Sequence, residues 1–151
     1  MKNIKNIKKI GIFSAAVFLL TFLFAVTGKS DDAKILEIKE KLFIQQCFDI
    51  MFNTNEYVGK TVKLEGIYKT FQYPSGSSMK ESHHVYRNSP GCCGDDGMVG
   101  FMVLLENCPE PEQNAWVEAV GKVEIADIGI AVLRLSSLKV MDVRGTEFVR
   151  Y

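Results

Sequence analysis

Hydrophobic and polar positions follow two different periods along the chain, and the first is helical. Between residues 31 and 53, apolar residues recur every three or four positions, and one stripe holds Leu36, Phe43, Cys47 and Ile50. Two aspartates at the start of this segment favour the positive end of a helix dipole. The spacing predicts an amphipathic helix, with Cys47 as a small buried hydrophobe on its inner stripe.

After residue 56 the period changes to two, which is typical of β-strands. Apolar and polar residues alternate, or apolar residues dominate, in segments 60–71, 83–89, 98–106, 115–127 and 128–143, the last of which fits one long strand or two short ones. Gly66 and Gly121 fall inside two of the long segments, where a glycine permits a bulge or a sharp bend. We predict a mainly β fold, a five-stranded OB-like barrel preceded by one N-terminal helix. A small open α+β sheet is the alternative.

The first 28 residues have the layout of an export signal. Four lysines, at positions 2, 5, 8 and 9, precede an apolar run from residue 10 to residue 26. That run is shorter than the ~20 residues that a membrane-spanning helix needs, which favours a signal peptide over an uncleaved N-terminal anchor. We therefore expect an extracytoplasmic protein with a signal or anchor at 1–28, the helix at 29–55 and the strands at 56–151.

Charge excludes one large class of partner. The leader holds four of the 18 Lys and Arg residues, so residues 29–151 carry 14 basic and 18 acidic residues, a net charge of −4. A chain without a basic stripe has little with which to neutralise phosphates, so we expect no nucleic-acid partner. The sequence also lacks a recognisable nucleophile–base–acid trio or phosphate-binding loop. It therefore predicts binding rather than enzymatic activity.

The segment "PGCCGDDG" concentrates the residues with metal chemistry. Thiolates bind thiophilic ions such as zinc, usually in sets of three or four ligands. We predict a zinc site with Cys92 and Cys93 as ligands, completed by Cys108 or by the pair His83 and His84. The surrounding loop can fold tightly around an ion because glycine tolerates positive φ, and it consists of Gly91, Gly94, Asp95, Asp96 and Gly97.

Other interpretations of the same segment stay open. The adjacent cysteines could form a strained, easily reduced disulfide, or one could act as a nucleophile, although nothing in the sequence activates it. They could equally serve only the structure of a tight turn. Residues that could line a separate binding face for a small molecule or glycan are Tyr73, His83, His84 and Tyr86. Against that, paired histidines on a strand are often simply solvated.

Four segments carry a family resemblance: "YVGKTVKLEGIY", "PGCCGDDGMVGF", "WVEAVGKVE" and "LRLSSLKVMD". Together they resemble the C-terminal domain of the DUF1980 family over residues 56–149, and the Gly-Cys-Cys-Gly loop is the most specific element. Members of that family typically carry membrane helices ahead of this domain and often accompany an integral-membrane permease. The resemblance implies an extracytoplasmic role near transport, with no established catalysis. It also implies an alternative function, docking on a permease with purely structural cysteines.

Overall fold

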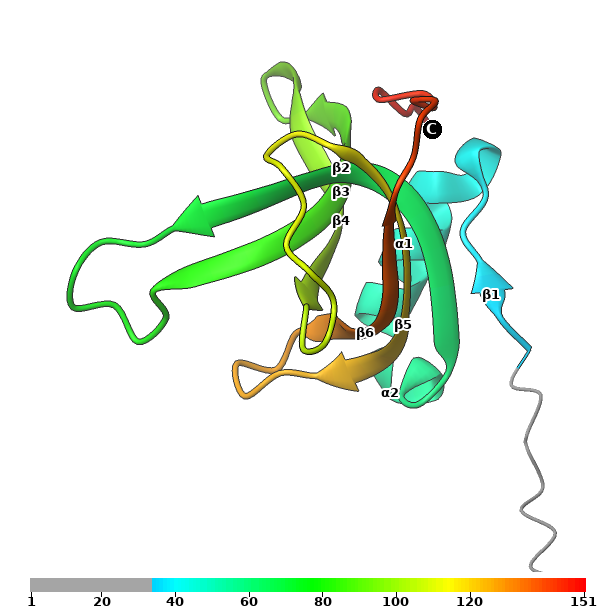
Figure 1. Cartoon of the computed structure of the whole chain (residues 1–151). Helices are drawn as coiled ribbons and strands as arrows, with labels where there is room; N and C mark the ends of the chain where they lie inside the picture. The colour runs from blue at the N-terminus through cyan, green and yellow to red at the C-terminus, as the bar shows by residue number, and fades with distance from the viewer. Residues whose placement is uncertain (1–33) are drawn as a thin grey trace, which may run out of the picture. The chain divides into compact units, whose positions relative to one another are not determined.

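Strands dominate the part of the chain that the computed structural model describes, residues 34–151 (Figure 1). The predicted signal or anchor at 1–28 lies outside this range. The elements are β1 (Leu36–Glu37), a 3-10 turn η1 (Glu40–Leu42), α1 (Phe43–Phe52), α2 (Thr54–Tyr57), β2 (Thr61–Gln72), β3 (Glu81–Gly91), β4 (Gly94–Leu104), β5 (Trp116–Ile125) and β6 (Ala131–Val140). None of the helices in residues 34–151 is long and apolar enough to cross a membrane.

The strands form one six-stranded mixed sheet in which hydrogen bonds run in a closed ring. The order is β1-β2-β3-β4-β6-β5, and β5 pairs in turn with β2. Pairing is antiparallel except between β1 and β2 and between β4 and β6. The five predicted strands correspond to β2–β6, and the C-terminal segment forms one long strand rather than two. The prediction of a mainly β fold is therefore confirmed.

Glycine allows β2 to change partners partway along its length. The strand pairs with β5 over residues 61–67 and with β3 over residues 67–72. A Cβ atom at Gly66 would lie 2.6 Å from the carbonyl oxygen of Tyr86, closer than such atoms ever come. Gly66 thus permits β2 and β3 to approach where β2 bends, in agreement with the bend predicted there.

Gly121 serves a comparable close approach between β5 and β6. Its hypothetical Cβ would lie 2.6 Å from the carbonyl oxygen of Arg134. The register shifts here, because Val120 pairs with Ser137 whereas Gly121 pairs with Leu135. Ser136 is the extra residue of this bulge, and its hydroxyl donates to the carbonyl of Val120 at 3.2 Å.

The predicted helix exists, but it is shorter than its apolar period suggested. Its buried face packs into the same core as the strands and consists of Phe43, Ile44, Cys47 and Ile50. Residues 40–42 form the 3-10 turn η1, but the prediction of helix was wrong over residues 34–39. There the backbone pairs with β2 instead: Leu36 and Glu37 align in parallel with Val62 and Lys63, and the Ile38 amide donates to the Lys63 carbonyl at 2.8 Å. Hydrogen bonds to an open strand edge replaced those of the first helical turns.

The C-terminal segment after β6 returns to the edge of β3. The Asn88 amide donates to the Glu147 carbonyl at 2.8 Å, and the Val149 amide donates to the Asn88 carbonyl at 2.9 Å. This part of β3 is the edge that β2 leaves uncovered, because β2–β3 pairing ends at Tyr86. The segment therefore fixes the half of β3 that leads to the cysteine loop.

Candidate functional site

Cys92 and Cys93 form the turn of the β3–β4 hairpin. Gly91 ends β3 and pairs with Gly94, which begins β4. In residues 34–151, positive φ outside glycine occurs only at Glu106 and Asn114, so neither cysteine adopts it. Gly94 does, with φ of +131°, and a side chain is poorly tolerated there. Both thiols are free and exposed at the tip of a long hairpin.

The other two loop glycines serve close approach rather than positive φ. A Cβ at Gly91 would overlap the Oδ1 atom of Asp96, so the Asp96 carboxylate occupies the space that a side chain would take. A Cβ at Gly97 would lie 2.7 Å from the Pro90 carbonyl oxygen. The register shifts around Pro90, which has no amide hydrogen to offer a partner strand. The bulge at Pro90 and the absence of side chains at Gly91 and Gly97 together allow the Asp96 carboxylate to lie over the turn.

Three exposed side chains consequently gather at the turn. One ligand atom from each of Cys92, Cys93 and Asp96 lies within 4.8 Å of the others. The two sulfur atoms are 3.5 Å apart. Thiolates bound to a tetrahedral zinc ion at ~2.3 Å are about 3.8 Å apart, whereas a linear arrangement would need about 4.6 Å. The sulfur atoms therefore lie close to the spacing of a tetrahedral site.

Asp95 lies beside this cluster but is engaged elsewhere. Its Oδ2 atom accepts a hydrogen bond from Arg150 at 3.2 Å, and the Arg150 guanidinium lies 4.6 Å from the centre of the Phe148 ring. Both partners of the ion pair are exposed, so the pair adds little stability. Two adjacent aspartates thus have different roles: Asp96 faces the thiols, and Asp95 ties the hairpin to the C-terminal segment.

Cys108 does not join the cluster. It lies beyond the far end of β4, and the ten residues that separate Gly94 from Leu104 span about 33 Å of extended chain. The Cys108 side chain is partly buried and packs against the hydrophobic core. Within residues 34–151, the two turn cysteines and Asp96 are the one group of three or more His, Cys, Asp or Glu residues close enough to share an ion.

The two histidines also lie far from the thiols, and they lie on opposite faces of β3. Seven residues of strand separate His84 from Gly91, which corresponds to about 23 Å. His83 points inward, where its Nδ1 atom is 2.7 Å from the Tyr68 hydroxyl and 3.8 Å from Glu110. Tyr68 is buried, and burial is the main reason why the pKa of its hydroxyl rises to about 12. His83 thus belongs to an internal polar network.

His84 points outward and is held by neighbours of its own. Its Nε2 atom is 2.8 Å from the Ser82 hydroxyl, which lies 3.0 Å from the Tyr73 hydroxyl. The ring of Phe71 meets the imidazole edge-on at 5.1 Å between centroids. Burial lowers the pKa of His84, because the charged imidazolium is desolvated there, and the neighbouring His83 adds to this effect. His84 is therefore neutral at pH 7.

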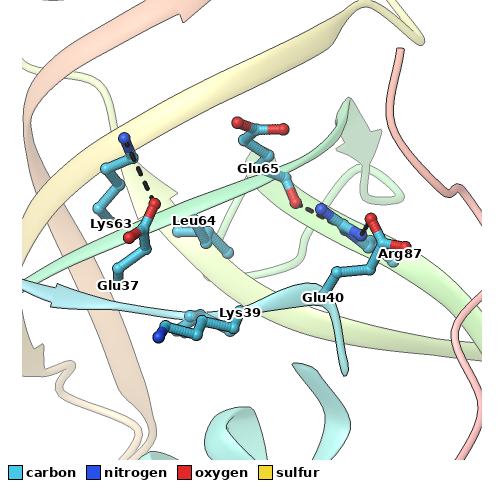
Figure 2. Close-up of a pocket in the computed structure, with 8 residues that line it drawn as sticks. Glu37, Lys39, Glu40, Lys63, Leu64, Glu65 and Arg87 are labelled. Atoms are coloured by element: carbon cyan, nitrogen blue, oxygen red, sulfur yellow. Dashed lines mark hydrogen bonds and ion pairs between the residues drawn. The ribbon is translucent and has the colours of Figure 1, made fainter. Parts of the chain in front are cut away.

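A buried arginine, which the sequence interpretation overlooked, lines a charged cleft beside the N-terminal strand. This cleft of about 360 Å³ lies between residues 37–40 and residues 63–65, and Figure 2 shows its charged lining. Arg87 is only 3% exposed. Its guanidinium donates to the Glu65 carbonyl at 2.9 Å and lies 3.5 Å from the Glu40 carboxylate (Figure 2). It also donates to the Thr146 carbonyl at 3.1 Å.

Arg87 acts as a structural centre rather than an open anion site. Its guanidinium carbon lies 4.7 Å from the centre of the Phe43 ring and 4.9 Å from that of Trp116. These contacts join α1, β5, β2 and the C-terminal segment around one cation. Strand alternation could have predicted that Arg87 is buried, because it lies two residues from Val85 and so points to the same inward face.

Comparison with known proteins agrees with the sequence resemblance. Residues 24–148 match the DUF1980 C-terminal domain, a span that includes both the helical segment and all the strands of the ring. No curated protein and no solved structure matches the chain. Because the match extends over most of the 151 residues, the chain belongs to the family of the DUF1980 C-terminal domain.

Proposed function

We propose that this protein is an extracytoplasmic binding module that captures a thiophilic metal ion, zinc, at the Cys92–Cys93 turn. The observation that supports this proposal is the convergence of two free thiols and the Asp96 carboxylate within 4.8 Å. Sulfur and oxygen ligands suit zinc, and the sulfur spacing of 3.5 Å suits a tetrahedral site. The role is binding rather than catalysis, in metal handling at the cell envelope.

The number of ligands favours an exchangeable ion over a structural one. Structural zinc sites usually hold four protein ligands, whereas three leave a position for water or for a donor from another molecule. All three side chains are exposed at the turn, so a partner protein can reach the ion directly. A site of this kind suits capture and transfer, in which the ion must leave as readily as it arrives.

The frame of the hairpin supports the same role. We interpret the closed ring of strands as an OB-like barrel, because its order is β2-β3-β4-β6-β5-β2 and its only parallel pair is β4–β6. Long β3–β4 pairing from residue 83 to residue 103 holds the turn on regular structure. Metal sites on such elements keep their ligand geometry better than sites on free loops.

Metal analysis of the purified, reduced chain tests the proposal. We expect about one equivalent of bound zinc, and we expect Co²⁺ as a substitute to give the near-ultraviolet absorption of a thiolate complex. Cys92→Ser should remove the binding. Asp96→Asn should weaken it, whereas Asp95→Asn should leave it unchanged.

The two adjacent aspartates provide the matched control, because the substitutions change the same chemical group one residue apart. Equal effects of Asp95→Asn and Asp96→Asn would show that only the local negative charge matters. Absence of stoichiometric metal in the wild-type chain, with no change on Cys92→Ser, would end the zinc proposal.

Docking on a membrane permease is a second candidate function, in which the cysteines serve only the turn. The observation that favours it is a set of exposed isoleucines around the β5–β6 turn: Ile125, Ile128 and Ile130. Clustered apolar side chains on a surface often mark a protein contact. Recovery of the chain with a permease from solubilised membranes, lost on Ile128→Ser but kept in the Cys92→Ser/Cys93→Ser double variant, would favour docking over metal capture.

A further inference from the structure

A hollow that contains two lysines opens beside the α2–β2 turn, next to the point where the described part of the chain begins. Its volume is about 530 Å³, which lies within the range of small-ligand sites. The lining includes two cations but no carboxylate, and it consists of Lys34, Leu36, Tyr57, Gly59, Lys60 and Thr61. The hollow therefore suits a ligand that carries a negative charge beside an apolar part.

Half-exposed apolar side chains stand next to the lysines. Ile35 follows Lys34, and Val58 follows Tyr57 in the α2–β2 turn. The Lys60 ammonium lies 4.6 Å from the centre of the Tyr57 ring. Lysine and tyrosine both combine an apolar body with a polar tip, which suits them to the boundary between lipid and water. This surface has the composition of a membrane-contacting surface.

The hollow offers positive charge although the exported part of the chain is acidic as a whole. Two acidic residues lie beside Tyr57, namely its neighbour Glu56 and Asp49. The Asp49 carboxylate accepts hydrogen bonds from the Tyr57 hydroxyl and from the Asn53 side chain. Neither carboxylate lines the hollow. An anion that enters the hollow therefore meets the ammonium groups of the two lysines.

The sequence brings this surface close to a membrane during export. The expected export signal carries its apolar run, residues 10–26, into the bilayer. Only the seven residues 27–33 separate that run from Lys34. An extended chain of seven residues spans at most ~25 Å. Lys34 and the hollow beside it therefore emerge next to the phospholipid headgroups, which supply phosphate.

Strand register places the cysteine turn at the opposite end of the domain. Thr61, which lines the hollow, pairs with Lys122. Arg134 pairs with both Lys122 and Leu104, so the four residues lie side by side across four strands. From Leu104, β4 leads back to Gly94 over about 33 Å of extended chain. A membrane at the hollow would leave the cysteine turn free to meet other proteins.

We propose that this end of the domain lies on the outer surface of the cell membrane, and that the hollow takes the phosphate group of an anionic phospholipid. Lys34 and Lys60 bind the phosphate. Ile35 and Val58 enter the boundary between the headgroups and the acyl chains. The proposal depends on export of the chain but not on metal binding at the cysteine turn.

The test uses residues 29–151, which lack the apolar run. Asp32–Tyr151 form one compact unit that contains the whole hydrophobic core, so removal of the leader leaves the fold intact. Vesicles of phosphatidylglycerol and phosphatidylcholine in equal parts carry a spin label on their headgroups, which broadens the ¹³C-methyl signals of side chains that touch the membrane. We expect the signals of Ile35 and Val58 to broaden. Vesicles of phosphatidylcholine alone should have little effect.

Methyl groups at the far end of the domain provide the internal control. Met98 is exposed and lies near the cysteine turn. Val143 is also exposed, and it follows Met141, whose amide donates to the carbonyl of Trp116 at the start of β5. The hollow lies beside the other end of β5. The signals of Met98 and Val143 should therefore stay sharp.

Substitutions then assign the contacts. Lys34→Gln and Lys60→Gln should each lower the affinity for the mixed vesicles about fivefold, and added salt should lower it further. Val58→Ser should lower it several-fold without a change in salt dependence. Lys80→Gln is the matched control, because Lys80 is an exposed lysine in the β2–β3 loop, and it should have no effect.

Three results would overturn the proposal. The first is equal broadening at Val143 and Val58, and the second is vesicle binding that the Lys34→Gln/Lys60→Gln double variant retains in full. The third is a response of both lysines to inorganic phosphate with no contact to vesicles, which would assign the hollow to a free anion. Zinc analysis of the same protein reports on the cysteine turn alone, so failure at one site is distinguishable from failure at the other.

Discussion

Replacement of Arg87 by methionine should destabilise the protein strongly, because this residue connects four segments of the chain from the inside. Methionine has a similar length and fills much of the same space without the charge. The substitution leaves the carbonyls of Glu65 and Thr146 without their donor, and it removes the cation from between the rings of Phe43 and Trp116. Glu40 is more than half exposed, so water can replace its lost partner.

The magnitude follows from these contacts. Two hydrogen bonds from a charged donor contribute ~1.5–3 kcal/mol each. Relief of the desolvation of the guanidinium, which already lowers the pKa of Arg87, offsets part of that loss because an apolar side chain has no such penalty. We expect a net loss of about 3 kcal/mol in the free energy of unfolding. Arg87→Lys should reduce the free energy of unfolding somewhat less. A lysine ammonium keeps the positive charge but lacks the planar guanidinium that donates to two carbonyls at once.

Urea denaturation measures this effect, with far-ultraviolet circular dichroism as the main signal. Fluorescence of Trp116, the single tryptophan, provides a second signal from beside the substituted residue. A loss of about 3 kcal/mol should also lower the melting temperature by roughly 10 °C for a domain of this size.

Arg144→Met is the matched control. Arg144 also lies near Trp116, at 5.9 Å from the ring centre, and donates to the Asn114 carbonyl at 2.9 Å. Its side chain is 44% exposed, so its removal should change stability by less than ~1 kcal/mol. If the two variants lose equal stability, burial of the Arg87 cation is not what stabilises this region.

Three further predictions follow from the geometry. Gly66→Ala should destabilise the fold by ~2 kcal/mol in a urea titration, because the new Cβ would press on the Tyr86 backbone. Gly76→Ala is the control: a Cβ has free space there, but the positive φ of this residue strains it, so the loss should be only about 1 kcal/mol. Gly91→Ala should destabilise the fold by ~1 kcal/mol, because its Cβ would lie 2.9 Å from the Gly97 backbone nitrogen. It should also reduce zinc affinity as Asp96→Asn does, since the Cβ displaces the carboxylate. Burial raises the pKa of Cys47 to about 12, above its unfolded value near 9.0. The native state therefore retains a proton that the unfolded state loses, so the free energy of unfolding should fall between pH 9 and 12. This fall should be shallower in the Cys47→Ala variant.

Local pattern was sufficient to predict the strands, but not which of them pair with one another to close the ring. Alternation identified β2–β6, and Gly66 marked the bend, because both signals depend only on neighbouring residues. The pairing of β4 with β6 joins residues 102–104 to residues 132–134, and nothing in either segment alone specifies that partner. The apolar period of residues 34–39 fitted a helix equally well. The free edge of β2 decided otherwise, and that edge exists only once the ring has formed.

The candidate zinc site shows the same division between local and distant information. The sequence singled out Cys92 and Cys93, because a turn of this composition is a local feature. It could not show that Asp96, rather than Asp95, lies over the thiols, since this depends on the bulge at Pro90 and the clearance above Gly91.

The histidines are more instructive, because the sequence contained the reason why they could not act as a pair. Adjacent residues on a strand point to opposite faces, so His83 and His84 cannot both turn toward the same ion without breaking the pairing. Residue count along β3 also placed both of them about 20 Å or more from the turn. What the sequence did not contain was the register of β4, which sets His84 opposite Met102 and Tyr86 opposite Gly100, where the Tyr86 backbone leaves no room for a side chain. The strand that separates the histidines from the cysteines thereby places His83 in the internal network with Tyr68 and Glu110, and it places His84 beside Ser82 and Phe71.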